Sequence, residues 1–422
     1  MAENEADSAA IDIEGLVSSI KAQMSQDQSM SPNCCIFRTP AILRELNEKA
    51  YVPNAFSVGP FHHGRPKYDD MEKIKYKYLQ GIISRSPRPD EMLRNLTKAV
   101  TDVEREAREC YAGPISYRPD EFVKILVIDG CFIIELFRKI ASEEAREDND
   151  PIFTMASMFE SLRHDLMLLE NQVPWMVLER LFKLTRDLTD NNVNKPLIEL
   201  VKLFVHRYLL TLPSVHPPFQ EMKHILDVTR KLLVSSIGAD EGQTKWILLP
   251  SATSLVEAGV KIKKGESRSI LDIKFDNGVL EIPPLLTHET TESFFRNIIG
   301  FEQCYPNCEP RFTSYAILLD NLINTTKDID VLSENKIIEN WLSAEDAVPF
   351  FNKLYYNANV KEIYYQSLCK KVNEYCNRRW PRWHAMLVHN YFNTPWAILS
   401  TIAAAILLIL SFLQTWYTIS KK

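Results

Sequence analysis

The stretch FTSYAILLDNLINT, residues 312–325, decides the fold class of this chain. Its apolar side chains recur three and four positions apart, which is the spacing of one face of an α-helix. They are Phe312, Tyr315, Ala316, Leu319, Leu322 and Ile323. The same spacing runs through residues 122–139, 159–186 and 197–210. Pro174 interrupts residues 159–186, so a kink or a break between two helices is expected there. The sequence therefore predicts a mainly helical protein.

In one region the spacing of the apolar residues changes from three and four positions to two. Leu271, Ile273 and Phe275 alternate with polar residues, and the tripeptide 276–278 (Asp-Asn-Gly) separates them from a second short apolar run at 279–282. Asn-Gly between such runs is a strong hairpin signal, because both turn residues accept a positive φ. With residues 259–263 before it, this pattern predicts a small antiparallel sheet of two or three strands, at about 259–283, inserted in the helical domain.

Composition places the chain among ordinary globular proteins. Of its 422 residues, 45% are hydrophobic and 25% are charged, which is enough for a sizeable core. Only 12 are glycine, which counts against folds with many tight turns and against glycine-rich phosphate loops. Because there is no repeat of fixed period and no long low-complexity linker, one helical domain at 33–392 is the simplest interpretation.

Residues 1–32 are acidic and serine-rich, and they predict a loosely ordered N-terminal arm. Within this arm, five apolar side chains share one helix face. They are Ile13, Leu16, Val17, Ile20 and Met24. Two interpretations stay open, a docking helix for a partner and a helix that lies on its own domain.

Charge and cysteine usage limit the partners. The net charge of -6 leaves no basic excess for a phosphate backbone, so no nucleic-acid partner is expected. Eight scattered cysteines are too few for a disulfide-stapled scaffold. Cys131 lies in an apolar run and is expected to be a buried free thiol.

Near the C-terminus, WAILSTIAAAILLILSFLQTWYTI occupies residues 396–419 and contains no charged side chain. As a helix it would measure ~36 Å, enough to cross a hydrocarbon core of ~30 Å. Trp396 lies at one end and Trp416 and Tyr417 at the other, as is typical of the two membrane interfaces. Lys421 and Lys422 follow, where headgroups would hold them. A buried helix is the alternative, but such helices seldom run this long without charge. The sequence predicts a transmembrane helix at 395–419, a short basic tail at 420–422 and a lipid bilayer as partner.

The start of the chain bears on topology. Three acids and no base precede Lys21, so no secretory signal is recognised. We therefore expect a single-pass, tail-anchored protein whose domain faces the cytosol. Reduced cysteines and unused glycosylation sequons at Asn95 and Asn324 follow from that topology.

Several blocks of sequence together resemble those of a known family. They are CIFRTP with LRELN at 35–47, AYVPN with SVGPFHHG at 50–64, MEKIK at 71–75, DGCFIIEL at 129–136, DLMLLENQVP at 165–174, LPSATSLVEAGV at 249–260, LEIPPL at 280–285 and RNIIGFEQC at 296–304. In order and number they resemble the large plant family grouped as domain of unknown function 247. The resemblance runs from about Cys34 to the terminal apolar segment.

The resemblance implies a plant source and a helical domain with a C-terminal anchor, usually assigned to the plasma membrane. It brings no established catalytic residues. Members in grasses are associated with pollen self-incompatibility, which favours recognition or signalling. We thus predict a non-enzymatic, membrane-tethered protein with unknown protein partners. The alternative is a membrane-bound enzyme, possibly a hydrolase, whose site comes from distant residues. A third interpretation is an organiser of contacts between membranes.

Candidate metal ligands are sparse. His62 and His63 are neighbours in an extended segment and point to opposite faces, so a shaped loop is favoured over a shared ion. Cys304 and Cys308 have near-ligand spacing, but no second Cys or His pair stands close by in sequence, and a zinc site would need Cys369 and Cys376 to approach them in space. The sequence therefore predicts no metal and no cofactor.

Catalytic candidates are equally sparse, since the chain has neither a nucleophile elbow nor a phosphate-binding loop. His164 adjoins Asp165, and Asp129 lies six positions from Glu135, off any shared helix face. No catalytic residue is predicted.

Other charged residues are interpreted as structural. Asp165 and Glu170 are expected to be buried in or beside a helix, partnered by Arg163 or a helix N-terminus. Residues 73–78 form a basic, aromatic stripe that is expected to be a solvated helix face rather than a lipid-binding surface. Its members are Lys73, Lys75, Tyr76, Lys77 and Tyr78.

Overall fold

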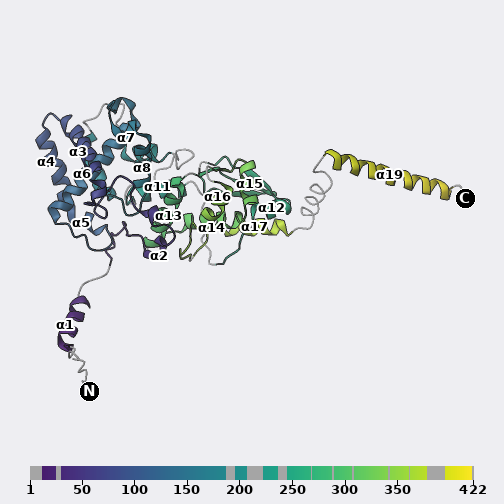
Figure 1. Ribbon diagram of the computed structural model, residues 1–422, viewed down its shortest axis with the longest axis horizontal. Helices are drawn as coiled ribbons and strands as arrows, with labels where there is room; N and C mark the ends of the chain where they lie inside the picture. Colours follow the sequence, from purple (N-terminus) through teal and green to yellow (C-terminus); the bar gives the residue numbers. More distant parts are fainter. Residues whose placement is uncertain are drawn as a thin grey trace, which may run out of the picture.

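The computed structural model describes residues 12–24, 30–186, 195–206, 222–235, 245–267, 269–287, 289–306, 308–340, 343–360, 362–377 and 395–420. Figure 1 shows an elongated helical body, with helix α1 (Ile13–Met24) apart from one end and helix α19 (Pro395–Ser420) apart from the other. The mainly helical fold predicted from the sequence is confirmed.

The N-terminal half of the body contains short and long helices. They are α2 (Ala41–Arg44), η1 (Glu48–Tyr51), η2 (Pro66–Tyr68), α3 (Asp69–Ser84), α4 (Pro89–Thr101), α5 (Glu104–Glu109), α6 (Pro119–Ala141), η3 (Glu143–Ala145), α7 (Pro151–Thr154), α8 (Ala156–Asp165), α9 (Trp175–Thr185), α10 (Leu197–Val205) and α11 (Ile225–Val234).

The C-terminal half adds two small sheets. Its elements are α12 (Ala252–Glu257), β1 (Lys261–Lys264), β2 (Lys274–Asp276), β3 (Val279–Ile282), β4 (Leu285–Thr287), α13 (Glu289–Cys304), α14 (Arg311–Leu322), α15 (Thr326–Glu334), β5 (Ile338–Asn340), α16 (Ala344–Asn352) and α17 (Gln366–Cys376).

Helix α6 is the centre of the N-terminal half. Proline at its first position and the acidic Asp120 and Glu121 in its first turn favour a helix start, since the missing N–H costs nothing there and the carboxylates complement the helix dipole. Almost all of its later side chains are buried against α3, α4, α9 and α10. Gly130 allows the close approach of α9, because a Cβ there would lie 2.5 Å from Leu181 Cδ1.

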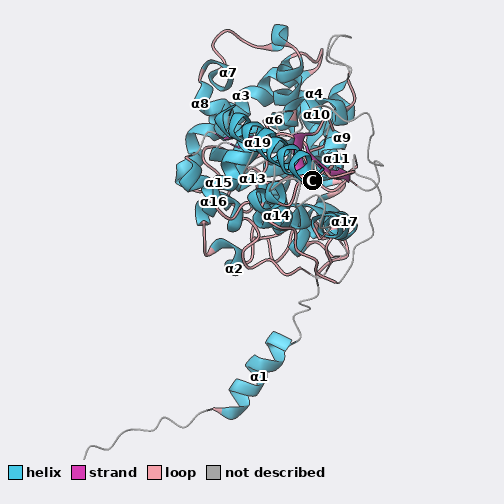
Figure 2. Cartoon of the chain, turned by 90° about the vertical axis from the view of Figure 1, so that its right-hand side faces the viewer, coloured by secondary structure: helices cyan, strands magenta, loops and turns pink. Residues whose placement is uncertain are grey.

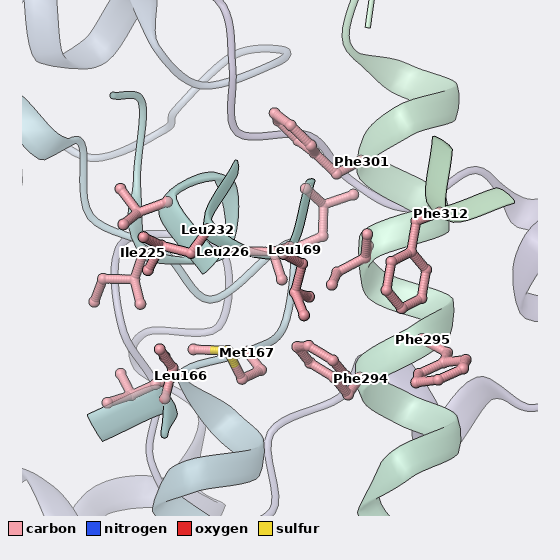
Figure 3. Close-up of a cluster of buried hydrophobic side chains, with 14 of the residues drawn as sticks. Leu166, Met167, Leu169, Ile225, Leu226, Leu232, Phe294, Phe295, Phe301 and Phe312 are labelled. Atoms are coloured by element: carbon pink, nitrogen blue, oxygen red, sulfur yellow. The ribbon is translucent and has the colours of Figure 1, made fainter. Parts of the chain in front are cut away.

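Aromatic side chains of α13 and α14 fill the middle of the body. Phe295 and Phe312 pack edge to face with ring centroids 4.8 Å apart. Figure 3 shows them in one cluster with Leu166, Met167 and Leu169 of the segment after α8 and with side chains of α11. One continuous buried cluster includes residues from both halves, so the two halves share a hydrophobic core.

The predicted hairpin is present, but the predicted all-antiparallel sheet is wrong. Strands β2 and β3 pair antiparallel across a turn in which Asn277 and Gly278 both have positive φ. Strand β1 instead pairs parallel to β3, in the order β1-β3-β2. The chain runs from β1 at one edge of the sheet to β2 at the other edge. The hairpin then returns it to the central strand β3, which runs in the same direction as β1. A second parallel pair, β4 with β5, was not predicted because three-residue strands carry no readable period.

The predicted helical stretches are confirmed with changed ends. Of the stretch 312–325, residues 312–322 lie in α14 and 323–325 follow its end, whereas 122–139 lie within α6. Residues 197–210 give α10, with 207–210 outside the described residues. The break at Pro174 is real but longer than expected, because 166–174 is a buried non-helical segment between α8 and α9.

The two flanking helices expose apolar side chains. All described side chains of α1 are exposed, so the interpretation in which this helix lies on its own domain is wrong. Figure 2 shows α1 apart from the body from a second direction. Helix α19 coincides with the predicted helix at 395–419, and its Trp416 and Tyr417 are exposed. The side chain of Trp396 and both terminal lysines, Lys421 and Lys422, lie outside the described residues.

Within the part of the chain that the structure describes, no helix has both the length and the apolar character needed to cross a membrane. The transmembrane assignment of 395–419 therefore has no support from the structure.

Two glycine substitutions test the hairpin assignment. Gly278 has φ +81°, and a Cβ there would overlap the Tyr375 hydroxyl, so Gly278→Ala should lower the free energy of unfolding by about 1–3 kcal/mol. Gly81 lies in α3 with open space around it, so Gly81→Ala should raise that free energy by about 0.5–1 kcal/mol. Urea unfolding followed by circular dichroism measures both. Equal effects of the two substitutions would contradict the turn geometry.

Candidate functional site

A set of buried polar side chains lies where the loop 53–64 meets the loop 165–174. We call five of these side chains the polar junction, because their hydrogen bonds hold these loops and the segments beside them in place. They are Asp129, Asp165, Glu170, Asn171 and Gln172.

Asp165 ends α8 and turns its carboxylate toward the first loop. It accepts hydrogen bonds from three successive backbone N–H groups, those of Asn54 (2.6 Å), Ala55 (2.8 Å) and Phe56 (2.7 Å). Such charge-assisted bonds stabilise a buried carboxylate without a cation. The expectation that Arg163 partners this carboxylate is therefore wrong; the Arg163 guanidinium stacks over Phe159 instead.

Asn171 continues the contact between the loops. Its side-chain oxygen accepts from the Val58 N–H at 2.6 Å, and its amide nitrogen donates to the Phe56 carbonyl at 2.9 Å. Gln172 donates to the carbonyls of Leu166 and Leu168. These amides replace the backbone partners that a strand would supply, so a non-helical segment can be buried without orphaned groups.

Glu170 binds three groups from the N-terminal part of the chain. It accepts from the Thr39 N–H at 2.6 Å, forms an ion pair with Arg44, and lies 3.3 Å from His62 Nε2. Burial alone would raise the pKa of Glu170, but the nearby His62 imidazole, the hydrogen bond from the Thr39 N–H and the Arg44 guanidinium lower it to about 2. The carboxylate is therefore charged at neutral pH.

His62 and His63 have different surroundings, as their adjacency in sequence predicted. His62 is buried and faces Glu170, whereas His63 packs edge to face on Tyr117 at a centroid distance of 5.7 Å. Gly59 explains the shape of this loop. It has φ +69°, and a Cβ there would lie 2.5 Å from the Gln172 carbonyl oxygen.

Lys75 is completely buried, so the prediction that it lies on a solvated helix face is wrong. Its ammonium donates to Asp129 at 2.7 Å and to Glu72 at 2.6 Å, and it also binds the Ser57 carbonyl. Burial would lower the pKa of Lys75, but the carboxylates of Asp129 and Glu72 outweigh it and raise that pKa. At 100° per residue, Lys75 points inward between its outward neighbours, Lys73 and Lys77.

Asp129 also accepts a hydrogen bond from the Gly59 N–H at 2.8 Å. Glu135 forms a bidentate pair with Arg85, at 2.7 and 2.6 Å. The two acids thus serve different contacts, and the acid–base pairing considered for them does not form.

Helix α13 contributes two further buried side chains. Asn297 accepts from the Leu169 N–H at 2.8 Å and donates to the Ala50 carbonyl at 2.8 Å. Glu302 accepts from the N–H of Thr313 at 2.8 Å, where it caps the start of α14, and pairs with Arg230 at 2.8 Å. Asn297 thus joins the loop 165–174 to Ala50, and Glu302 joins α13 to α14 and α11.

His164 and Asp165 do contact each other, with Nδ1 2.8 Å from the carboxylate. Asn54 Nδ2 lies 3.2 Å from the same ring nitrogen. A carboxylate that orients an imidazole is half of a nucleophile–base arrangement. Here, however, the same carboxylate is already bonded to three backbone N–H groups, so the pair has an evident structural use.

Among the described residues, no group of three or more His, Cys, Asp or Glu side chains is arranged to hold a metal ion. Cys304 and Cys308 thus do not combine with Cys369 and Cys376 into a ligand set. Cys131 is a fully buried free thiol, as predicted, and burial raises its pKa to about 12.

Surface depressions surround the segment 30–37. One, of about 470 Å³, is lined by Met30, Cys34, Phe37 and Tyr305. A second, of about 200 Å³, is lined by Cys35, Cys110, Trp175 and Lys223 among others. Sequence reasoning missed both, because their walls come from segments far apart along the chain and no local pattern joins them.

These features define a class: a mainly helical protein in which separate sequence blocks supply the buried polar groups that lock its loops. The family DUF247, described as "Plant protein of unknown function", matches residues 36–410, and the chain belongs to this family. The resemblance seen in the sequence blocks is thereby confirmed.

Two relatives from Arabidopsis thaliana are similar over nearly the whole chain. UPF0481 protein At3g47200 is 29% identical over 411 residues, which cover 91% of this chain and 86% of the relative. Putative UPF0481 protein At3g02645 is 22% identical over 499 aligned positions, with coverage of 94% and 92%. No solved structure matches the chain.

The buried ion pair of Lys75 and Asp129 should be costly to break. Lys75→Met leaves the Asp129 carboxylate buried without a cation, so we expect the free energy of unfolding to fall by about 3–5 kcal/mol. Adding Asp129→Asn should recover part of this loss, because the amide still accepts from Gly59. Lys73→Met, at an exposed pair, is the matched control and should change stability by less than about 0.5 kcal/mol. A mild effect of Lys75→Met in urea unfolding would contradict the buried pair.

His224 should give the fold an acid sensitivity. It precedes α11, and its Nε2–H donates to the Cys35 carbonyl at 3.0 Å. Burial lowers its pKa from 6.5 to about 4, although Asp227 opposes the shift. The unfolded chain therefore takes up the proton first, so stability is complete above pH 6.5 and is lost as the pH falls toward 4.

From pH 7.5 to 5, this group alone should remove about 2 kcal/mol from the free energy of unfolding. Urea unfolding at both pH values measures the loss, and Glu170 titrates below this window. His224→Gln should flatten the pH dependence, whereas the exposed His206→Gln should not. An unchanged slope in His224→Gln would show that another group is responsible.

Proposed function

We propose that this chain is a membrane-tethered protein that acts without catalysis, by recognising other proteins at the cytosolic face of the plasma membrane. The observation that carries the proposal is the exposure of apolar side chains along α19. Leu407 is 66% exposed, Leu408 72% and Phe412 68%. Apolar surface in water costs roughly 25 cal/mol per Å², so a helix of this kind favours an apolar environment.

The sequence supports the same environment, since 396–419 has no charged side chain. A lipid bilayer covers all sides of a helix at once, which suits a helix with exposed side chains along its described length. This part of the proposal rests on the uncharged sequence of 396–419 and on the exposure of the described side chains of α19.

A role in recognition is supported by the burial of the charged polar-junction groups and by the exposure of the apolar side chains of α1. The charged groups of the polar junction bind backbone N–H groups and the side chains of Lys75 and Arg44, as an architectural role requires. The apolar face of α1, with Ile13 and Met24 exposed, is of the kind that docks into a partner groove. Tethering would raise the local concentration of such a face near membrane partners. Absence of enzymatic activity remains a prediction.

Vesicle flotation tests the tether. The full-length chain should float with phosphatidylcholine vesicles, and Leu407→Arg/Leu410→Arg should abolish flotation, because each arginine costs about 2.5–3.5 kcal/mol near the centre of a span. The matched control is Leu16→Arg/Ile20→Arg on α1, which should float like the unaltered chain. Flotation that survives the α19 substitutions would contradict the tether.

Proximity labelling in plant cells tests recognition. The labelled set of plasma-membrane proteins should be lost in Leu407→Arg/Leu410→Arg, and it should shrink in Ile13→Asp/Ile20→Asp, which retains the anchor but disrupts the apolar face of α1. If both variants label the same proteins as the unaltered chain, membrane-tethered recognition is excluded.

A further inference from the structure

The segment 33–37 lies beside the end of α5 and pairs with it over a single parallel bridge, Ile36 with Tyr111. The N–H groups of Cys35 and Ile36 both donate to the Cys110 carbonyl, at 2.9 and 2.8 Å. In this parallel register, the residue before Ile36 is opposite the residue before Tyr111. Cys35 and Cys110 are therefore direct neighbours across the bridge.

This placement fits the geometry of a disulfide. Neighbouring strands lie about 4.8 Å apart, and disulfides join Cα atoms about 4.4–6.8 Å apart. Both thiols are free. The two cysteines are separated by 74 residues in sequence, so only the fold brings them together.

The two thiols also differ in environment. The neighbouring Cys35 thiol lowers the pKa of Cys110 and the Lys223 ammonium adds to this effect, whereas burial and the carboxylates of Glu109 and Glu106 oppose it. The Cys110 thiol also lies 3.4 Å from the Glu106 carbonyl oxygen. A lowered pKa increases the thiolate fraction, and the thiolate is the nucleophile.

A small molecule can reach this pair from solvent. Both cysteines line the depression of about 200 Å³, together with Lys223, Glu106 and Trp175. Cys110 is 7% exposed and Cys35 1%, so Cys110 is the more accessible of the two. A hydroperoxide is small enough for such a depression, and the ammonium of Lys223 is placed to favour the negative charge of a thiolate.

We propose that Cys35 and Cys110 form a peroxide-reactive dithiol, in which Cys110 is oxidised first and Cys35 resolves it to a disulfide. The Cys110 thiolate attacks one peroxide oxygen, the O–O bond breaks, and the leaving oxygen departs as water or an alcohol after taking a proton. The Cys35 sulfur then attacks the sulfenic sulfur and displaces water. Two thiols and one peroxide give one disulfide, one water and one water or alcohol.

Other thiols in this part of the chain are less suited to the first step. Burial raises the pKa of Cys34 to about 11, with a contribution from Cys110, and raises that of Cys304 to about 11. Both are protonated at neutral pH and react slowly. The proposed disulfide would join the root of the N-terminal arm, which carries α1, to the end of α5. It does not depend on the membrane tether.

The test uses the reduced full-length chain with one equivalent of hydrogen peroxide, followed by alkylation and peptide mass spectrometry. We expect a Cys35–Cys110 cross-linked peptide that dithiothreitol reverses. Cys34→Ser should retain it, which separates Cys35 from its neighbour. Cys35→Ser should lose it and instead trap Cys110 as a sulfenic acid that reacts with dimedone. Cys110→Ser should lose both products.

Circular dichroism of each variant shows that loss of the product is not loss of the fold. The proposal is overturned if folded, unaltered chain keeps Cys35 and Cys110 alkylated after peroxide, or if the cross-link joins Cys34 instead. It is also overturned if dimedone labels Cys34 or Cys304 in Cys35→Ser while Cys110 stays unreacted.

Discussion

The carboxylate of Asp165 is the contact on which the rest of the structure depends. It is buried, and three consecutive N–H groups at 54–56 supply its hydrogen bonds. Fixing these three residues positions the next ones, so that Val58 reaches Asn171 and Gly59 reaches Asp129. A buried donor without its acceptor costs about 1–3 kcal/mol, so removal of one carboxylate affects several groups at once.

This hydrogen-bond network explains what the sequence blocks shared with the family have in common. Three blocks that lie far apart along the chain supply these partners: Asp129, Asp165, Glu170, Asn297 and Glu302 all bind the backbone of another segment. Their polarity therefore specifies how the loops are arranged. The surfaces left for recognition are elsewhere, on the exposed helices and in the depressions beside residues 30–37.

Local patterns predicted the local structure. The helix at 312–325 and the hairpin turn at Asn277 and Gly278 follow from period and turn chemistry, which a short stretch of sequence contains. The parallel pairing of β1 and the burial of Lys75 were missed, because each depends on a partner distant in sequence. The polar residues around Lys75 in the sequence predict an exposed side chain. Its buried partner, Asp129, lies 54 positions away, so no local pattern predicts the contact. The choice of Arg44 rather than Arg163 as a partner of the buried acids has the same cause.

The central claim is that the buried polar residues of these blocks are architectural. Native-state hydrogen exchange at the backbone amides of Asn54, Ala55 and Phe56 tests it most directly. The account predicts that these amides exchange only in the globally unfolded chain, as slowly as those in the middle of α6, although they belong to a loop. Exchange close to the rate of an unstructured peptide, with α6 still protected, would contradict it.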